Sequence, residues 1–297
     1  MALARVTLSR YDALRYKPPP AMMDAEQFIV DNHQATVISQ SFGATEESFN
    51  STQSLLNLRH AFVSAAADGV TVLASSGDFG TANPGKSPTP NPVTVPFPTV
   101  QWPASDPLVT AVGGTYLCVN PTTGTGIDNT DPPPDCHVTP GVREIGWTDA
   151  GGGFSHVFAK PAYQNTLPGG STAIGAMRGV PDVAFQASSH TGTLVYDTAP
   201  GAGGWFIVGG TSCSAPQWAG LVAIADQIAG HGLGVINSTV YKLADGANYG
   251  MDFYDVTTGK NQTNPAIPGY PATAGWDPVT GLGTPNAANL VPQLAAG

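Results

Sequence analysis

A serine in the octapeptide Gly-Gly-Thr-Ser-Cys-Ser-Ala-Pro lies between a strand-like apolar run and a helix-like run. This residue is Ser212. The preceding Gly209-Gly210 lets the backbone turn tightly, and a helix N-terminus presents positive partial charge to the alkoxide and oxyanion of acyl transfer. A Thr-Ser pair alone more often caps a helix, so the interpretation as a nucleophile depends on the whole octapeptide.

A second candidate, Asp78, ends a buried strand-like run in the sequence Ser-Ser-Gly-Asp-Phe-Gly. A carboxyl group can donate a hydrogen bond to an oxyanion only while it is protonated, so this role predicts catalysis at acidic pH. An aspartate after a strand commonly serves as a turn or helix cap instead. Its occurrence together with Ser212 favours the catalytic role.

The serine followed by proline four positions later, in a Gly-Thr-Ser context, is the nucleophile signature of the subtilisin-like clan. None of the six histidines stands in the His-Gly-Thr context of a subtilisin base. The chain resembles the sedolisin branch, the serine-carboxyl peptidases, which use a glutamate as the base with an aspartate behind it. The other segments of that family recur in order: Ser75-Ser-Gly-Asp, Trp102-Pro-Ala-Ser-Asp, Val112-Gly-Gly-Thr, Gly151-Gly-Gly-Phe-Ser and Val180-Pro-Asp-Val-Ala.

This resemblance implies a serine-type endopeptidase that cleaves polypeptides at acidic pH through an acyl-enzyme on Ser212. Asp78 would replace the asparagine of the subtilisin oxyanion hole. The resemblance leaves two alternatives open. The first is a tripeptidyl exopeptidase. The second is a catalytically inactive homologue or fragment that keeps a peptide-binding cleft.

The C-terminal part resembles the calcium site of the same family, in which two aspartates and several backbone carbonyls surround the ion. Asp255 and Asp277 would supply carboxylates, and Val256 and Gly275 would supply carbonyl oxygens to one structural calcium ion, which prefers six to eight oxygen ligands. Thr273 stands where relatives often have glycine. The structural alternative is a pair of aspartates in Asx turns.

The catalytic glutamate and aspartate of the family stand four residues apart on a helix that precedes the first matched strand. Here the first 20 residues contain one acid, Asp12. Asp24 and Glu26 are two positions apart and would face different sides of a helix, so they are not assigned as the pair. We therefore expect that this chain lacks the N-terminal part and propeptide of the family.

The composition excludes some classes of function. With a net charge of −10 and only 11 lysines and arginines, the chain is not expected to bind nucleic acid. No stretch is apolar for the 18 or more residues of a membrane span. The N-terminus has no signal-peptide core, so the secretion that the family and the acid chemistry imply would need a signal upstream. We expect a monomer.

The elements that must position these residues alternate between helix and strand, which predicts a parallel sheet with crossover helices. We expect one domain over residues 1–297, with a subtilisin-like, doubly wound α/β fold and helices on both faces of the sheet. Helices are predicted over 21–32, 51–67 and about 215–228, and strands over 35–42, 70–76, 108–115, 193–197 and 205–209.

Cys118 and Cys136 bracket a loop rich in proline and glycine. A disulfide there would remove roughly 3 kcal/mol of chain entropy from the unfolded state. Two free thiols are an equally weighted alternative, because three cysteines in 297 residues do not decide the compartment.

Overall fold

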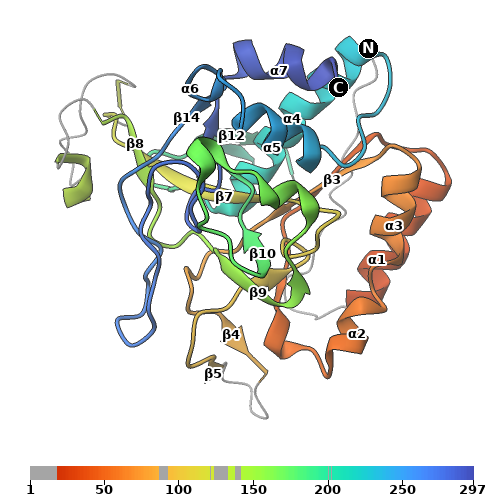
Figure 1. The fold of residues 1–297 in the computed structure, drawn as a ribbon, viewed down its shortest axis with the longest axis horizontal. Helices are drawn as coiled ribbons and strands as arrows, with labels where there is room; N and C mark the ends of the chain where they lie inside the picture. The colour runs from red at the N-terminus through yellow and green to blue at the C-terminus, as the bar shows by residue number, and fades with distance from the viewer. Residues whose placement is uncertain are drawn as a thin grey trace.

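The central sheet is mostly parallel and has the order β1-β3-β7-β11. Its strands β3 and β7 are labelled in Figure 1. The computed structural model describes residues 19–86, 93–120, 122–123, 133–137, 142–199, 201 and 203–297. The parallel strands are β1 (Val37–Gln40), β3 (Thr71–Ser75), β7 (Thr110–Leu117) and β11 (Val183–Gln186), and β8 (Glu144–Gly146) joins β7 antiparallel. The expected parallel α/β sheet is confirmed.

Helices cover both faces of this sheet, because successive side chains of a buried strand point to opposite sides. Leu73 of β3 packs into an apolar cluster with Trp218 and Val222 of α4 (Thr211–Ala229), whereas Val72 and Ala74 pack into a second cluster around α1 (Pro19–Asp31) and α3 (His60–Ala67). In Figure 1, α1 to α3 stand together on one side and α4, α5 and α7 on another. The doubly wound arrangement is therefore confirmed.

Two predicted helices differ from the structure. The helix expected over 51–67 is broken into α2 (Thr52–Leu56) and α3, because the amides of Leu58 and Arg59 bond to carbonyls three residues back and tighten the chain into a turn. Helix α4 begins four residues before the expected start at Ala215, which puts Pro216 inside the helix and not in its first turn. Strand β11 was not predicted.

A separate antiparallel hairpin, β12 (Thr193–Asp197) and β13 (Gly204–Val208), leads into α4. Its expected strands are confirmed. One face of the hairpin is apolar and exposed: the exposed fractions are 63% for Leu194, 58% for Tyr196, 69% for Trp205 and 62% for Ile207. Cross-strand pairing brings Tyr196 edge-on to Trp205, with ring centroids 5.2 Å apart.

The remaining elements are short. They are the strands β2 (Ala44–Thr45), β4 (Pro84–Gly85), β5 (Val93–Thr94), β6 (Gln101–Trp102), β9 (Gly153–Ala159), β10 (Met177–Val180), β14 (Phe253–Tyr254) and β15 (Thr284–Pro285), the helices α5 (Asn237–Ala244), α6 (Tyr249–Asp252) and α7 (Ala287–Ala295), and the 3-10 turns Glu46–Ser48, Pro134–His137, Ala162–Asn165 and Pro168–Gly170.

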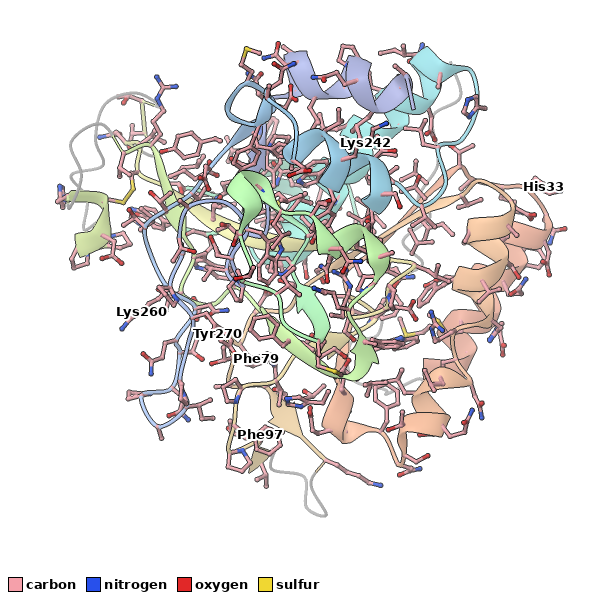
Figure 2. The ribbon with its side chains drawn as sticks, in the orientation of Figure 1. His33, Phe79, Phe97, Lys242, Lys260 and Tyr270 are labelled. Atoms are coloured by element: carbon pink, nitrogen blue, oxygen red, sulfur yellow. A yellow bond between two sulfur atoms is a disulfide. The ribbon has the colours of Figure 1, made fainter. Side chains whose placement is uncertain are left out.

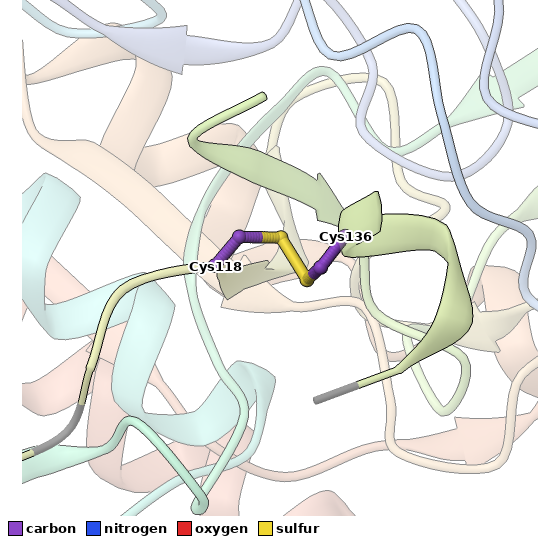
Figure 3. The surroundings of a disulfide bond; sticks show 2 residues. All are labelled: Cys118 and Cys136. Atoms are coloured by element: carbon purple, nitrogen blue, oxygen red, sulfur yellow. A yellow bond between two sulfur atoms is a disulfide. The ribbon is translucent and has the colours of Figure 1, made fainter. Parts of the chain in front are cut away.

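A disulfide joins Cys118, which follows β7, to Cys136 (Figure 3). The two Cα atoms are 5.5 Å apart, and the bridge packs with Tyr116 and Ile145 in a small buried cluster. Of the two alternatives that the sequence left open, the structure contains the disulfide. In the part of the chain that the structure describes, no helix has the length and apolar character of a membrane span.

Candidate active site

The N-terminus of α4 lies at the carboxyl ends of the parallel strands. Gly210, just before α4, donates its amide hydrogen to the carbonyl of Ala187, which directly follows β11, at 2.6 Å. Asp78 follows the end of β3, and Ser41 follows the end of β1. Ser212, the second residue of α4, therefore lies where open α/β sheets place their ligands. The strand before it, β13, belongs to the hairpin and not to this sheet.

Asp78 binds the first residue of α4 through one oxygen. Its Oδ1 accepts hydrogen bonds from the backbone nitrogen and from Oγ1 of Thr211, both at 2.8 Å. Asp78 thus caps a helix from a distant segment, which is the structural role that competed with the catalytic one. Within the described residues no hydrogen bond reaches its Oδ2, so the capping role leaves one oxygen of the exposed carboxyl open to a ligand.

Gly210 must be glycine beside this carboxyl group. Its φ is +89°, in the region that favours glycine, and a Cβ at this position would lie 2.6 Å from Asp78 Oδ2. Any side chain would therefore strain the backbone and displace the carboxyl group.

The glycine run after Asp149 brings a further carboxyl group to this region. Gly151 donates its amide hydrogen to the carbonyl of Gly77 at 2.7 Å, and a Cβ on Gly151 would lie 2.1 Å from the carbonyl oxygen of Ser76. Burial, and next the neighbouring Asp78 carboxylate, raise the pKa of Asp149. Asp149 was not among the predicted site residues; the signal available in the sequence was an aspartate two positions before the run Gly151-Gly-Gly.

Helix α4 is fixed to the sheet below Ser212. The indole nitrogen of Trp218 donates to the carbonyl of Ala184 at 2.8 Å, and Oγ of Ser214 donates to the carbonyl of Gln186 at 3.0 Å. Both carbonyls belong to β11. Because these contacts are buried, they hold the first turn of the helix in one position.

Ser212 is half-buried, and no described side chain accepts a hydrogen bond from its hydroxyl. Its carbonyl oxygen accepts one from Oγ of Ser41 at 2.9 Å. Phe79, which follows Asp78, is half exposed (Figure 2). Its carbonyl accepts a hydrogen bond from Oγ1 of Thr263 at 2.7 Å, which ties the segment after Asp78 to the C-terminal loop.

Asp24 and Glu26 do not form an acid pair. Asp24 is exposed, whereas Glu26 is 7% exposed and accepts a hydrogen bond from Nε2 of Gln40 at 2.5 Å. The expectation that the two carboxyls face different sides of the helix is confirmed. Burial raises the pKa of Glu26 to about 8, despite the hydrogen bond from Gln40. Asp12 lies outside the described residues.

One matched motif has a structural role. Asp182, in the segment Val180-Pro-Asp-Val-Ala, forms a fully buried ion pair with Arg178, with contacts of 2.6 and 2.7 Å. The same carboxylate accepts hydrogen bonds from the Tyr241 hydroxyl at 2.9 Å and from the Ala111 amide at 2.8 Å. Through Asp182, which directly precedes β11, this network connects β10, β7 and α5.

The candidate calcium residues lie together in the C-terminal loops. Gly275 donates its amide hydrogen to Asp255 Oδ2 at 2.9 Å. The Tyr249 hydroxyl lies close to the same carboxyl group, but by hydrogen-bond geometry the buried Asp255 Oδ1 has no partner among the described residues. Asp277 accepts hydrogen bonds from the amides of Thr273, Val279 and Thr280, which is the Asx-turn arrangement that competed with calcium binding.

The donor set at these loops fits a calcium ion. Within the described residues, no hydrogen bond reaches the carbonyl oxygens of Val256, Thr273 or Gly275, and the Asp255 oxygen is an orphaned buried acceptor. These are oxygen ligands of the kind that calcium prefers. No group of three or more His, Cys, Asp or Glu residues that could hold a metal occurs in the described ranges, so such a site would depend on carbonyl oxygens.

Comparisons with known proteins find similar sequences over most of this chain. The chain is 35% identical to kumamolisin of Bacillus sp. strain MN-32 over 272 residues, covering 88% of this chain and 43% of that protein. It is 32% identical to sedolisin of Pseudomonas sp. strain 101 over 263 residues (88% and 41%) and 32% identical to a tripeptidyl-peptidase of Arthroderma otae over 293 residues (89% and 42%). No family profile matches.

The structure is similar to that of a Pseudomonas sedolisin, described as a serine-carboxyl proteinase, in complex with two molecules of pseudo-iodotyrostatin. The TM-score is 0.75 with 28% sequence identity, and the match covers 95% of this chain and 71% of that one. The chain therefore spans less than half the length of the curated relatives named above, and about seven tenths of the solved chain.

Proposed function

Because the chain belongs to the sedolisin family of serine-carboxyl peptidases, we propose that it is a serine endopeptidase that cleaves polypeptides at acidic pH, with Ser212 as its nucleophile. The observation that carries this proposal is the placement of Ser212 and Asp78 at one helix terminus. Asp78 is fixed through hydrogen bonds to Oδ1, and its Oδ2, which lies beside Gly210, can accept a hydrogen bond from a substrate or donate one to it.

In this proposal the Ser212 hydroxyl attacks the peptide carbonyl and forms an ester with the acyl part of the substrate, while the amine leaves with a proton. The protonated form of the Asp78 carboxyl group donates a hydrogen bond to the oxyanion of the tetrahedral intermediate. The backbone amides at the start of α4 add positive partial charge at the same place. Water then hydrolyses the ester.

The test is digestion of an internally quenched polypeptide near pH 4 and near pH 7 by the protein and by its Ser212→Ala variant. We expect cleavage near pH 4 that disappears in the variant. Equal cleavage by both proteins would refute the proposal, and no cleavage by either at any pH between 3 and 8 would favour the catalytically inactive homologue or fragment that the sequence left open.

A tripeptidyl exopeptidase is the second candidate, because the chain is also similar to a tripeptidyl-peptidase. Substrates with a free and with an acetylated N-terminus distinguish the two activities. An endopeptidase cleaves both substrates, whereas release of tripeptides from the free N-terminus alone would favour the exopeptidase.

We also propose that one structural calcium ion binds Asp255, Asp277 and the carbonyl oxygens of Val256 and Gly275. The orphaned Asp255 oxygen and the free carbonyls support this proposal. A chelator should then lower the melting temperature, and calcium, not magnesium, should restore it. An Asp255→Asn variant should be insensitive to both additions; a melting temperature that does not respond to calcium in the unaltered protein would contradict the site.

The last proposal concerns the domain organisation, the oligomeric state and the location of the protein. We propose that residues 1–297 form one peptidase domain that is monomeric and secreted, since a disulfide is favoured in oxidising compartments. Sedimentation of the purified protein tests the monomer, and detection in the culture medium of its source tests secretion.

A further inference from the structure

The contact between Ser41 and Ser212 joins two segments that are 171 positions apart in the sequence. Oγ of Ser41 donates a hydrogen bond to the backbone carbonyl oxygen of Ser212 at 2.9 Å. Ser41 directly follows β1, and Ser212 is the second residue of α4. The hydroxyl of one serine thus meets the main chain of the other at the edge of the sheet.

The carbonyl of Ser212 needs a donor from outside the helix. In an α-helix this oxygen would accept the amide hydrogen of the residue four positions later. That residue is Pro216, which lies inside α4 and has no amide hydrogen. The Ser41 hydroxyl therefore supplies the hydrogen bond that the helix itself cannot make.

Two strand ends consequently hold the main chain on both sides of the Ser212 side chain. On one side, Asp78 after β3 binds the amide and the hydroxyl of Thr211. On the other side, Ser41 after β1 binds the carbonyl of Ser212. Because the Cα of Ser212 lies between these two anchored groups, the direction of its Cα–Cβ bond is fixed relative to the sheet.

We infer that Ser41 is a positioning residue for the nucleophile: its hydroxyl replaces the amide that Pro216 lacks and so fixes the Ser212 main chain. This inference rests on the proposed role of Ser212. Ser41 is exposed, so water can solvate the freed carbonyl when the hydroxyl is removed. The change should therefore affect catalytic geometry more than folding.

The first experiment compares peptide cleavage near pH 4 by the unaltered protein and by Ser41→Ala. We expect a two- to tenfold lower kcat with KM little changed, because this factor corresponds to the net free-energy contribution of one hydrogen bond. Ser41→Thr keeps a hydroxyl and should restore most of the rate. The matched control is Ser39→Ala, because the Ser39 hydroxyl, in the strand that precedes Ser41, is buried and has no partner among the described residues; its kcat should stay unchanged.

The second experiment adds Pro216→Ala, which gives the helix an amide hydrogen for the Ser212 carbonyl. In this background, Ser41→Ala should lower kcat by less than half of its effect in the unaltered protein. An equal loss in both backgrounds would overturn the inference, as would a kcat that Ser41→Ala leaves unchanged.

If no variant shows cleavage that depends on Ser212, the proposed function fails, and the contact is then tested by the free energy of unfolding. A double-mutant cycle over Ser41→Ala and Pro216→Ala measures the coupling of the two positions. A smaller destabilisation by Ser41→Ala in the Pro216→Ala background would support the replacement of the missing amide. Additive effects would overturn it.

Discussion

Asp78 Oδ1 lies 2.8 Å from both the backbone nitrogen and the hydroxyl oxygen of Thr211, the residue that precedes Ser212. The main chain at the nucleophile is therefore bound to the residue proposed to stabilise the oxyanion. Since Asp78 Oδ1 is occupied by these bonds, substitutions at Asp78 can separate its capping role from its role in catalysis.

Asp78→Asn should keep the cap, because the amide oxygen can accept from Thr211 while the amide nitrogen donates in place of the protonated carboxyl group. Asp78→Ala loses both and should lower kcat by about 100- to 1,000-fold. The kcat near pH 4 distinguishes the variants: Asp78→Asn should keep most of the rate, because its amide nitrogen still donates a hydrogen bond. Equal losses of kcat in the two variants would argue against Asp78 as the oxyanion donor.

Gly210→Ala should abolish most activity, because the new Cβ would meet Asp78 Oδ2 and the backbone has a φ of +89°. The strain is expected to lower the free energy of unfolding by about 1–2 kcal/mol. The matched control is Gly220→Ala in the same helix, where a Cβ meets nothing within 4 Å. It should stabilise the protein by about 0.5–1 kcal/mol and leave activity unchanged. Equal effects of the two substitutions would contradict the close approach at Gly210.

Glu26 should make stability fall as the pH rises. Burial raises its pKa to about 8 from the ordinary value of 4.5, so the folded state keeps a proton that the unfolded chain releases between these values. The contribution of Glu26 to the free energy of unfolding is fully present below pH 4.5. At pH 7, at most about 3 kcal/mol of it is lost. Urea unfolding at pH 4.5 and 7 measures it.

The Glu26→Gln variant should show a smaller decline in the free energy of unfolding between these two pH values. Asp24→Asn on the same helix removes an exposed carboxyl and serves as its control. If both variants keep the full decline, the buried Glu26 does not cause it.

The sequence indicated the parallel sheet and the helices on both faces, because these depend on local patterns, and the unusual octapeptide around Ser212 indicated the family. Strand β11 escaped prediction because it is four residues long and follows Pro181-Asp182, whose role depends on Arg178. The contact between Ser41 and Ser212 was also out of reach, since it joins segments that come together only in the folded sheet.

The buried pair of Arg178 and Asp182 should be essential for folding. Arg178→Leu leaves the Asp182 carboxylate buried without its partner, which is expected to lower the free energy of unfolding by about 3–5 kcal/mol. Arg143→Leu, at an exposed arginine, is the control and should change it by less than 1 kcal/mol. Chemical unfolding of both variants at one pH is the measurement; similar values for the two would contradict this role.

The disulfide should stabilise the protein without affecting catalysis. Replacing Cys118 and Cys136 by serine is expected to lower the free energy of unfolding by about 3 kcal/mol, because 18 positions separate the two cysteines. Dithiothreitol should destabilise the unaltered protein and leave the double variant unaffected. The third cysteine, Cys213, is buried and free, so a response of the double variant to the reductant would have to come from another cause.

Helix α4 presents Ser212 in its first turn and fills the core with Trp218 and Val222 further along. In a library of random variants, this one segment would therefore be selected twice: at Ser212 for activity, and at Trp218 and Val222 for folding. A variant depleted from an activity screen at these positions has an ambiguous cause until its abundance is measured as well. Few changes in α4 should pass both selections, and this helix should be among the slowest parts of the protein to diverge.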